Sequence, residues 1–448
     1  MGEEELDHEA IRRRCTVIRS GSLSTSDEEI AHLSQALKNS ILRIEPLYKI
    51  VLTGGPCGGK TTALARLSYY LRERGFEVMT VPEAFTIMAS NGFSMEYFSV
   101  GGMPFEVQNA VMDMQIALED SFERILRARG KPSVMLCDRG LMDGAAYVTS
   151  EEWDSFCNTR GVSSIDLREG RYNAVFHLVT AAEGAEQFYT LENNEARTET
   201  AEEARQLDVS SRRAWVGHHS LSVFDNSTDF EGKMQRLVDA TARLVGLPSN
   251  LHRVARKYLL RSKPNLEDFP ESVKYQVFDV EKVYLYDGTN EISEGPPQKY
   301  AEEYSFIRKR TQIGEGGGKG TSYGLTVVSI THDRKVIEVK RIINAREYAS
   351  AFKTRDLTRH VVRQQRISFL WNMQSFNIHI YNEPDTGLCI LHAQVNESRS
   401  DNKQNKETDN TFDLLVDMPS FLHVERRITS LKEDNEKYGA FNISLIKN

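Results

Sequence analysis

The residues of this chain best suited to chemistry lie at positions 54–62, in the run GGPCGGKTT. Their spacing, G-x-x-x-x-G-K-T, is that of a P-loop, in which backbone N–H groups surround nucleotide phosphates. The lysine at this spacing neutralises β- and γ-phosphate oxygens, and the threonine hydroxyl binds Mg²⁺. We therefore expect a nucleotide site with these contact residues: Gly54, Gly55, Pro56, Cys57, Gly58, Gly59, Lys60, Thr61 and Thr62.

Three charged residues that directly follow apolar runs are the candidate catalytic groups. Asp138 can hold Mg²⁺ together with Thr61, or it can be a helix N-cap with no metal. Arg139 can clamp a phosphoryl oxygen, because its planar guanidinium matches that group, or it can form an ordinary surface salt bridge. Glu83 can be the general base for a substrate hydroxyl or a group behind the Mg²⁺ ligands, and the plain alternative is a helix cap.

Two further segments of the N-terminal half carry candidate nucleotide contacts. The polar helical stretch 195–213 can be a lid whose arginines close over the phosphates, or a solvated helix; the residues concerned are Arg197, Arg205, Arg212 and Arg213. In the loop 225–229, Asn226 is placed where a nucleotide base would lie, and it can equally cap the following helix.

Alternating strands and helices must position these groups. Residues 49–53 form a β-branched run before the glycine loop, and 63–71 are apolar at helical spacing, with Gly75 closing the helix. A further helix is expected over 105–129, and four further strands over 76–83, 133–140, 173–178 and 220–224. This alternation predicts an α/β parallel sheet with helices on both faces and ligands at the carboxyl ends of its strands.

From residue 251 onward the pattern changes to strands with period-2 alternation. Strands are expected over 254–260, 278–286, 303–310, 335–341, 376–381, 389–395 and 421–427. Many such strands separated by turn residues predict an antiparallel β-barrel or sandwich.

Basic residues of this second half share strand faces, because side chains two positions apart point to the same side of a sheet. Arg308 and Arg310 form one such pair, and Lys257 and Lys340 are further basic candidates. If these residues face a barrel interior, they predict an anion site; if they face outward, they are solvated charges. Residues 253–366 carry 22 Lys and Arg against 15 Asp and Glu, and this surplus favours anion binding.

Composition separates two modules and limits the class of protein. The 448 residues suit two or three domains, and residues 1–250 carry 26 Lys and Arg against 37 Asp and Glu. The five cysteines form no CxxC pair, which indicates a reducing, cytoplasmic setting without a disulfide scaffold or zinc site. No apolar run approaches the length of a membrane span, so any membrane contact is expected to be peripheral, with endosomal or other membranes. No nucleic-acid-binding motif occurs.

The N-terminal motifs resemble the deoxynucleoside kinase and nicotinamide-riboside kinase branch of P-loop proteins. The resemblance rests on the P-loop and on two runs, Val81-Pro82-Glu83 and Asp138-Arg139-Gly140. It implies that Glu83 is the base and Arg139 the clamp, although the third position of the latter run is usually Ser in that branch. Residues 1–250 lack the NKxD element by which Ras-like proteins read guanine, so the sequence does not give the base preference.

The C-terminal half resembles the CYTH or triphosphate-tunnel fold, whose strands line a channel with Lys and Arg. That family begins with E-x-E-x-K, which holds a divalent metal. Aligned on Lys257, the two glutamate positions are Arg253 and Ala255 here, which argues against metal-dependent triphosphate hydrolysis and favours anion binding.

The fusion of these two parts resembles the TRPL translocation defect protein family of invertebrate photoreceptors. The resemblance implies GTP binding with Mg²⁺, recognition of phosphoinositides, and a role in moving a light-regulated channel between membranes. The corresponding domains are an N-terminal arm and helix (1–44), a P-loop domain (45–248) and a CYTH-like domain (251–448). Two functions stay open: a nucleotide-regulated lipid-binding adaptor with slow or no GTP hydrolysis, and a small-molecule kinase that uses ATP or GTP with Glu83 as base.

Overall fold

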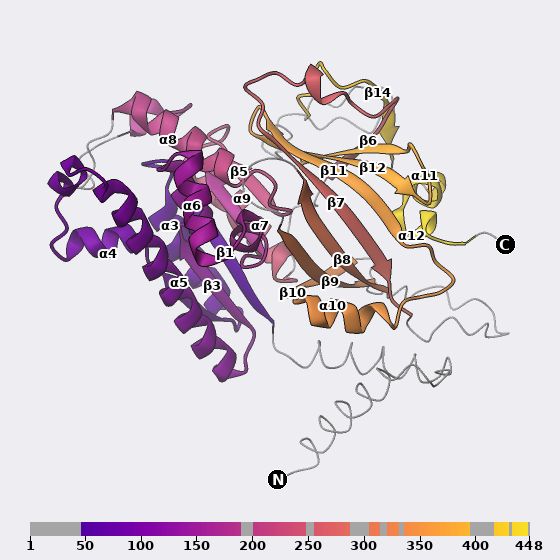
Figure 1. The fold of residues 1–448 in the computed structure, drawn as a ribbon, viewed down its shortest axis with the longest axis horizontal. Coiled ribbons are helices and arrows are strands. Elements are labelled where there is room, and N and C mark those ends of the chain that lie inside the picture. The colour runs from indigo at the N-terminus through magenta and orange to yellow at the C-terminus, as the bar shows by residue number, and fades with distance from the viewer. Residues whose placement is uncertain are drawn as a thin grey trace, which may run out of the picture.

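The computed structural model describes residues 46–189, 200–247, 255–286, 304–313, 320–330, 336–394, 416–429 and 432–446. Within these ranges the chain forms a helix-flanked sheet from its N-terminal half and a second, strand-rich part from its C-terminal half (Figure 1). The arm and helix expected over 1–44, together with Arg197 and Arg253, lie outside the described residues.

The first sheet has five parallel strands in the order β2-β3-β1-β4-β5. They are β1 (Leu47–Thr53), β2 (Glu77–Val81), β3 (Ser133–Asp138), β4 (Ala174–Leu178) and β5 (Leu221–Phe224). β1 lies in the centre because its residues are almost all buried, so it needs cover on both faces. The predicted α/β parallel sheet is confirmed, and the P-loop leaves its central strand.

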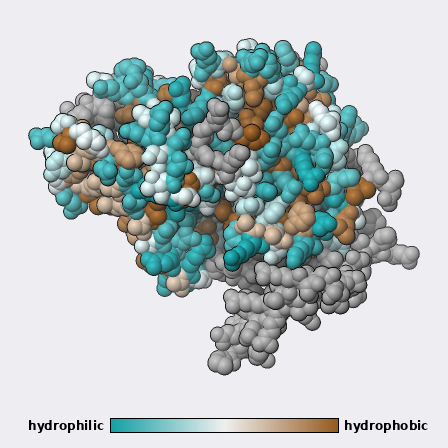
Figure 2. Space-filling model, viewed as in Figure 1, coloured by the Kyte–Doolittle hydropathy of each residue, from teal (hydrophilic) through white to brown (hydrophobic). Residues whose placement is uncertain are grey.

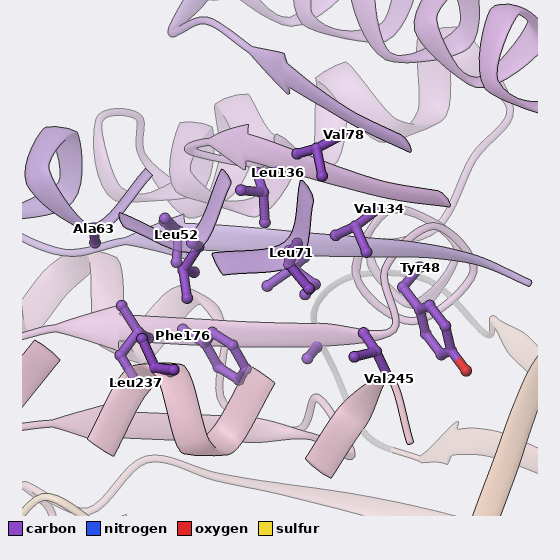
Figure 3. Packing of buried hydrophobic residues seen from close by; sticks show 14 of the residues in the cluster. Tyr48, Leu52, Ala63, Leu71, Val78, Val134, Leu136, Phe176, Leu237 and Val245 are labelled. Carbon is purple, nitrogen blue, oxygen red and sulfur yellow. The ribbon is translucent and has the colours of Figure 1, made fainter. Parts of the chain in front are cut away.

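Two layers of helices cover this sheet, and the two-residue period of its strands decides which side chains meet which layer. Ile50 and Leu52 face α3 (Lys60–Arg72) and α9 (Phe230–Leu244), in the cluster that Figure 3 shows from close by. Val51 faces the opposite cluster, to which α5 (Met103–Arg129) and α6 (Ser150–Arg160) contribute. Burial on both faces fixes the strand register, because a shift by one residue would exchange the two faces.

Shorter helices complete this part of the chain. They are α4 (Ala84–Ser90), η2 (Met95–Ser99), η3 (Leu141–Ala146), α7 (Ser164–Arg168), η4 (Glu186–Phe188) and α8 (Ala201–Ala214). α4 begins directly after Glu83, and η3 follows Asp138 and Arg139, so both lie at the carboxyl edge of the sheet.

The second sheet is antiparallel, as predicted, with the strand order β10-β9-β8-β7-β11-β12-β13-β6-β14. Its strands are β6 (Ala255–Leu260), β7 (Tyr275–Tyr284), β8 (Tyr304–Ile313), β9 (Thr321–Ile330), β10 (Val336–Ile343), β11 (Val362–Trp371), β12 (Gln374–Glu383), β13 (Cys389–Gln394) and β14 (Val424–Ile428). In the described part of the chain no ladder joins the outer strands β10 and β14. The helices here are η5 (Leu266–Asp268), α10 (Ala345–Phe352), α11 (Lys432–Tyr438) and α12 (Ala440–Ile443).

The two faces of this sheet differ in polarity. Alternate residues of β11 and β12, such as Ile367 and Ile378, join an apolar cluster that also contains Phe269 and Leu422 from the connecting segments. The residues between them, such as Gln364 and Arg366, belong to the opposite face. This second face is polar and basic, and it carries the candidate anion-binding residues.

A buried ion cluster joins the two parts of the chain. Glu169, just after α7, pairs with Arg310 of β8 at 2.6 Å and with Arg168 at 3.2 Å, and all three side chains are at most 2 % exposed. Arg310 also donates to the carbonyl of Gly217, and Ser322 of β9 donates to Glu169. Because buried charges are costly unless paired, this cluster holds β8 and β9 against α7.

The surface of the molecule is mostly hydrophilic in the view of Figure 2, and the hydrophobic residues there gather in separate small groups. Among the described residues, no helix combines the length and apolar character needed to cross a bilayer.

Candidate functional site

The glycine loop between β1 and α3 has the backbone of an anion-binding loop. Gly54 and Gly59 have φ values of 133° and 90°, which favour glycine, and Cys57 has a φ of 56°. A Cβ on Gly54 would lie 2.0 Å from the carbonyl oxygen of Leu178, so no other residue fits there. The loop ends at the N-terminus of α3, where free N–H groups and the helix dipole favour a phosphate.

Lys60 points back over this loop. Its Nζ donates to the carbonyl oxygens of Gly54 at 3.0 Å and Gly55 at 3.1 Å. Burial and the nearby Arg139 lower the pKa of Lys60 to about 8, against opposing effects of three carboxylates. A phosphate anion bound beside this ammonium would raise its pKa back toward the ordinary value.

Asp138, at the end of β3, fits the predicted magnesium role. Its Oδ1 is buried without a hydrogen-bond partner, and burial raises its pKa. The cap of the next helix, η3, is Gly140, so the alternative that Asp138 caps it is wrong. Thr61 is exposed in the first turn of α3, where its hydroxyl can reach a shared ion. In the described residues no cluster of three or more His, Cys, Asp or Glu suits a metal, and Mg²⁺ typically takes one or two protein ligands plus phosphate and water.

Glu83 and Arg139 are brought together from the ends of two neighbouring strands. Arg139 Nε donates to Glu83 at 2.5 Å, and the second oxygen of Glu83 accepts from Thr86 at 2.8 Å. Burial acts to raise the pKa of Glu83, but Arg139 and Lys60 outweigh it and hold the pKa below its ordinary value. Glu83 occupies the N-cap position of α4 without a side-chain cap bond. It is thus ionised and able to accept a proton.

Sequence reasoning missed two carboxylates beside the loop. Asp143 accepts hydrogen bonds from Thr53, the last residue of β1, and from the Gly140 N–H. Asp208, on α8, accepts from the Gly55 N–H at 2.9 Å. Both are buried, and the only available signal was that Asp143 stands five residues after Asp138.

Asn226 forms hydrogen bonds that connect two segments of the fold. Its Nδ2 donates to the carbonyls of Thr180 and Glu183, both at 2.8 Å, and its Oδ1 accepts from Lys233 at 2.9 Å. The cap of α9 is Asp229, whose side chain accepts from Gly232, so the alternative that Asn226 caps this helix is wrong. Asn226 ties the segment after β4 to α9, and its amide hydrogens are already donated to carbonyls.

Three of the arginines expected to form a lid lie on α8, and they differ in exposure. Arg212 is buried at 9 % exposure, and its guanidinium lies 3.5 Å from Asp208 and 3.7 Å from Glu183. Arg205 donates to the Ala182 carbonyl at 2.7 Å, and Arg213 is exposed. Of these, Arg212 has the environment least like that of a solvated helix.

The polar face of the second sheet gathers basic side chains from many strands. Strand register pairs Arg308 with Lys282, Arg366 with His379, and His392 with Lys257, and directly paired residues point to the same face. Register also assigns Lys340 and Arg310 to this face. His379 and His392 stack with ring centroids 4.1 Å apart.

Arg308 and Arg366 form no ion pairs in the part of the chain that the structure describes. Arg308 forms no hydrogen bond there either, and Arg366 donates only to the side-chain oxygen of Gln364. Burial and the neighbouring Arg310 lower the pKa of Arg308 to about 10, against an opposing effect of Glu169. Burial and Arg308 lower the pKa of Arg366 to about 9. Like charges in this arrangement favour an anion between them.

The other predicted anion-binding residues differ in exposure and in whether their charge is already paired. Arg310 is committed to Glu169, and its guanidinium lies 3.4 Å from the Phe278 ring, so its charge is already compensated. Lys340 is exposed on β10, and Lys257 is half-buried on β6. Arg308 and Arg366 are therefore the central members of this basic face, and Arg366 was not predicted.

Comparison with known proteins supports the N-terminal interpretation. A comparison with curated proteins found no matching relative. Residues 49–233 match the family model of an AAA domain, which covers less than half of the chain. This match supports a P-loop nucleotide-binding domain over the part that contains Lys60, Asp138 and Arg139. The resemblance of the C-terminal half to the CYTH fold, and of the whole chain to the TRPL translocation defect family, stays a prediction. Residues 49–233 are thus similar to the AAA domains among P-loop proteins.

Proposed function

We propose that this chain is a nucleotide-regulated anion-binding protein. Its P-loop binds a nucleoside triphosphate with Mg²⁺, and the basic face of its second sheet binds a phosphate-rich headgroup. One observation carries the proposal: a lysine and an unpaired carboxylate oxygen lie together at the P-loop. Lys60 donates to the carbonyls of its own loop, and a buried oxygen of Asp138 has no hydrogen-bond partner. The resemblance specifies GTP, phosphoinositides and the transport of a light-regulated channel, and we adopt these as parts of the proposal.

The residues divide the work of nucleotide binding. The N–H groups at the start of α3 and Lys60 bind phosphate oxygens. Thr61 and Asp138 would hold Mg²⁺, which would supply positive charge beside the triphosphate. Arg139 is kept in place by Glu83 at the same edge of the sheet. Its guanidinium lies close enough to Lys60 to lower the lysine pKa, so both cations face one anion position.

The basic face supports the second half of the proposal. Burial, Arg308 and Arg310 lower the pKa of Arg366, and a multiply charged phosphate headgroup would relieve the repulsion among these cations. Arg363, on the same strand as Arg366, provides a contrast, because it pairs with Glu383 and Glu281 at the exposed surface. On the opposite face of β11, Arg366 donates to Gln364 and forms no ion pair among the described residues.

Vesicle co-sedimentation tests this half of the proposal. The wild-type chain is expected to bind vesicles of phosphatidylcholine with a few per cent of phosphatidylinositol phosphate, and not vesicles of phosphatidylcholine alone. Arg308→Gln together with Arg366→Gln should reduce binding at least about tenfold, whereas Arg363→Gln should leave it unchanged. Equal binding by the double variant and the wild type would disprove the assignment, and competition by soluble inositol phosphate would separate headgroup from bilayer.

A kinase is the second candidate, and the placement of Glu83 favours it. This ionised carboxylate shares the sheet edge with Lys60 and Asp138, where a general base for an acceptor hydroxyl would be needed. The kinase predicts that Glu83→Gln abolishes phosphoryl transfer to nucleosides while nucleotide binding survives. The adaptor predicts no transfer by the wild type either, so a screen of hydroxyl acceptors with ATP and GTP separates the two functions.

A further inference from the structure

Asp208 of α8 is a buried carboxylate with an unusual set of partners for a helix residue. Its Oδ1 accepts hydrogen bonds from the N–H of Gly55 at 2.9 Å and of Thr180 at 3.0 Å. Its Oδ2 lies 3.0 Å from Nε2 of His177, on β4. One carboxylate thus connects the P-loop, the segment after β4 and helix α8.

The rest of the P-loop entrance is held against the same segment. Thr180 Oγ1 donates to the Pro56 carbonyl at 2.5 Å. A Cβ added to Gly55 would lie 2.9 Å from Cβ of Asp208, and one on Gly58 would lie 2.6 Å from the Leu178 carbonyl oxygen. Neither glycine leaves room for a Cβ, so the loop backbone packs directly against these residues. The loop therefore cannot shift without moving α8 or the residues after β4.

We propose that Asp208 is a positioning residue for the nucleotide site. It holds the first turn of the P-loop through the Gly55 N–H, so that the later N–H groups of the loop stay directed toward the phosphates. It does not itself contact the nucleotide. The inference rests on the nucleotide-binding function proposed above, and it adds the element, α8, that keeps the binding loop in shape.

The charge of Asp208 suits this role. Burial acts to raise its pKa, but His177 and Arg212, together with the bonded Gly55 N–H, hold the pKa well below its ordinary value. The carboxylate is therefore ionised over the whole neutral range, and ionised acceptors form stronger hydrogen bonds with backbone N–H groups. Arg212, 3.5 Å away, keeps a compensating positive charge beside it.

Substitution tests the proposal by fluorescent-nucleotide titration at a temperature where every variant is folded. Asp208→Ala should weaken nucleotide binding at least about tenfold, because the Gly55 N–H loses its acceptor. Asp208→Asn should restore most of the affinity, since its amide oxygen still accepts from Gly55. Asp239→Ala is the matched control: Asp239 is a buried carboxylate on α9, bonded to Gln235 on the same helix. Its loss should lower thermal stability without changing the nucleotide Kd.

Each outcome separates this inference from the proposed function. Wild-type affinity in folded Asp208→Ala would overturn the positioning role, whereas a wild-type chain that binds no nucleotide would overturn the proposed function itself. Hydrogen exchange of the wild type supplies a test that needs no variant. The Gly55 amide should be protected without nucleotide, and the amides of residues 57–61 should gain protection only with nucleotide. An unprotected Gly55 amide would contradict the inference.

Discussion

The environment of one residue, Asp138, supports the proposed Mg²⁺ site. A buried oxygen without a hydrogen-bond partner costs free energy, and here it is placed beside a lysine at the end of a phosphate loop. A divalent ion would supply the missing partner and return the pKa of the carboxyl below its raised value. The charge of Asp138 should therefore matter only when the ion is present.

Asp138→Asn tests this dependence on the ion. The variant should bind nucleotide about tenfold more weakly than the wild type in Mg²⁺, because the amide oxygen is a poorer ligand for a hard cation. In EDTA the two proteins should bind equally, or the variant slightly better, since a buried negative charge near the phosphates has been removed. Fluorescent-nucleotide titrations in both buffers give the comparison. An equal loss of affinity in both would contradict a metal-binding role.

The sequence predicts some residues of this site and not others, for a geometric reason. Glu83 follows β2, while Asp138 ends β3 and Arg139 follows it. The carboxyl ends of parallel strands meet at one edge, so the proximity of these residues could be expected. Asp208 reaches Gly55 from 153 positions away, on a helix whose packing no local pattern specifies. Side chains that support a loop across the fold are therefore found only with the structure.

At the scale of elements, the basic face depends on strand alternation in β8 and β11. Arg308 of β8 and Arg366 of β11 lie on one face of the sheet with β7 between their strands, and this face also carries polar residues such as Gln364 and Ser368. This polarity explains why β11 was not predicted: its buried polar residues break the apolar alternation that identifies a strand. β9, with Gly324 in its interior, was missed because glycine weakens the strand signal.

Arg308→Leu should stabilise the protein while it impairs anion binding. Removing one of several neighbouring cations relieves repulsion and desolvation, so the free energy of unfolding should rise by about 1 kcal/mol. Urea denaturation without phosphate measures this change, and the same variant should lose most of the stabilisation that inositol phosphates give the wild type. A variant that is destabilised without ligand and still stabilised by inositol phosphate would contradict an anion site at Arg308.

At the scale of the whole molecule, Glu169 is the residue that joins the nucleotide-binding part to the second sheet. Burial acts to raise its pKa, but Arg310 and Arg168 outweigh burial and hold the pKa below the ordinary value. A carboxyl group with a lowered folded-state pKa contributes stability that is complete above its unfolded-state pKa. That contribution is lost as the pH falls through the folded-state pKa.

Glu169→Gln should therefore destabilise the chain strongly at neutral pH. Breaking a buried pair leaves two guanidinium groups without their anion, and such changes cost about 3–5 kcal/mol. Urea denaturation of wild type and variant at several pH values gives the free energies of unfolding. The difference between them should be constant from pH 7 to about pH 5 and shrink below about pH 4. A difference that grows as the pH falls would show that the sign of the pKa change is wrong.

The overall architecture was predictable because both halves repeat one pattern many times: strand–helix alternation in the first, strand alternation in the second. The joint between them was not, because it depends on Glu169 and Arg310, two charged residues 141 positions apart that carry no local signal. Arg310 was expected at an anion site because of its strand position, but in the structure its guanidinium forms an ion pair with Glu169.

Isothermal titration calorimetry of the chain with Mg²⁺ and GTP, and separately with Mg²⁺ and ATP, measures whether the P-loop binds nucleotide. We predict that wild type binds one nucleotide per chain and that Lys60→Ala removes this binding. Lys131→Ala, which changes an exposed lysine at the opposite end of the sheet, should bind as the wild type does. Absence of binding by wild type with either nucleotide, or undiminished binding by Lys60→Ala, would contradict the account.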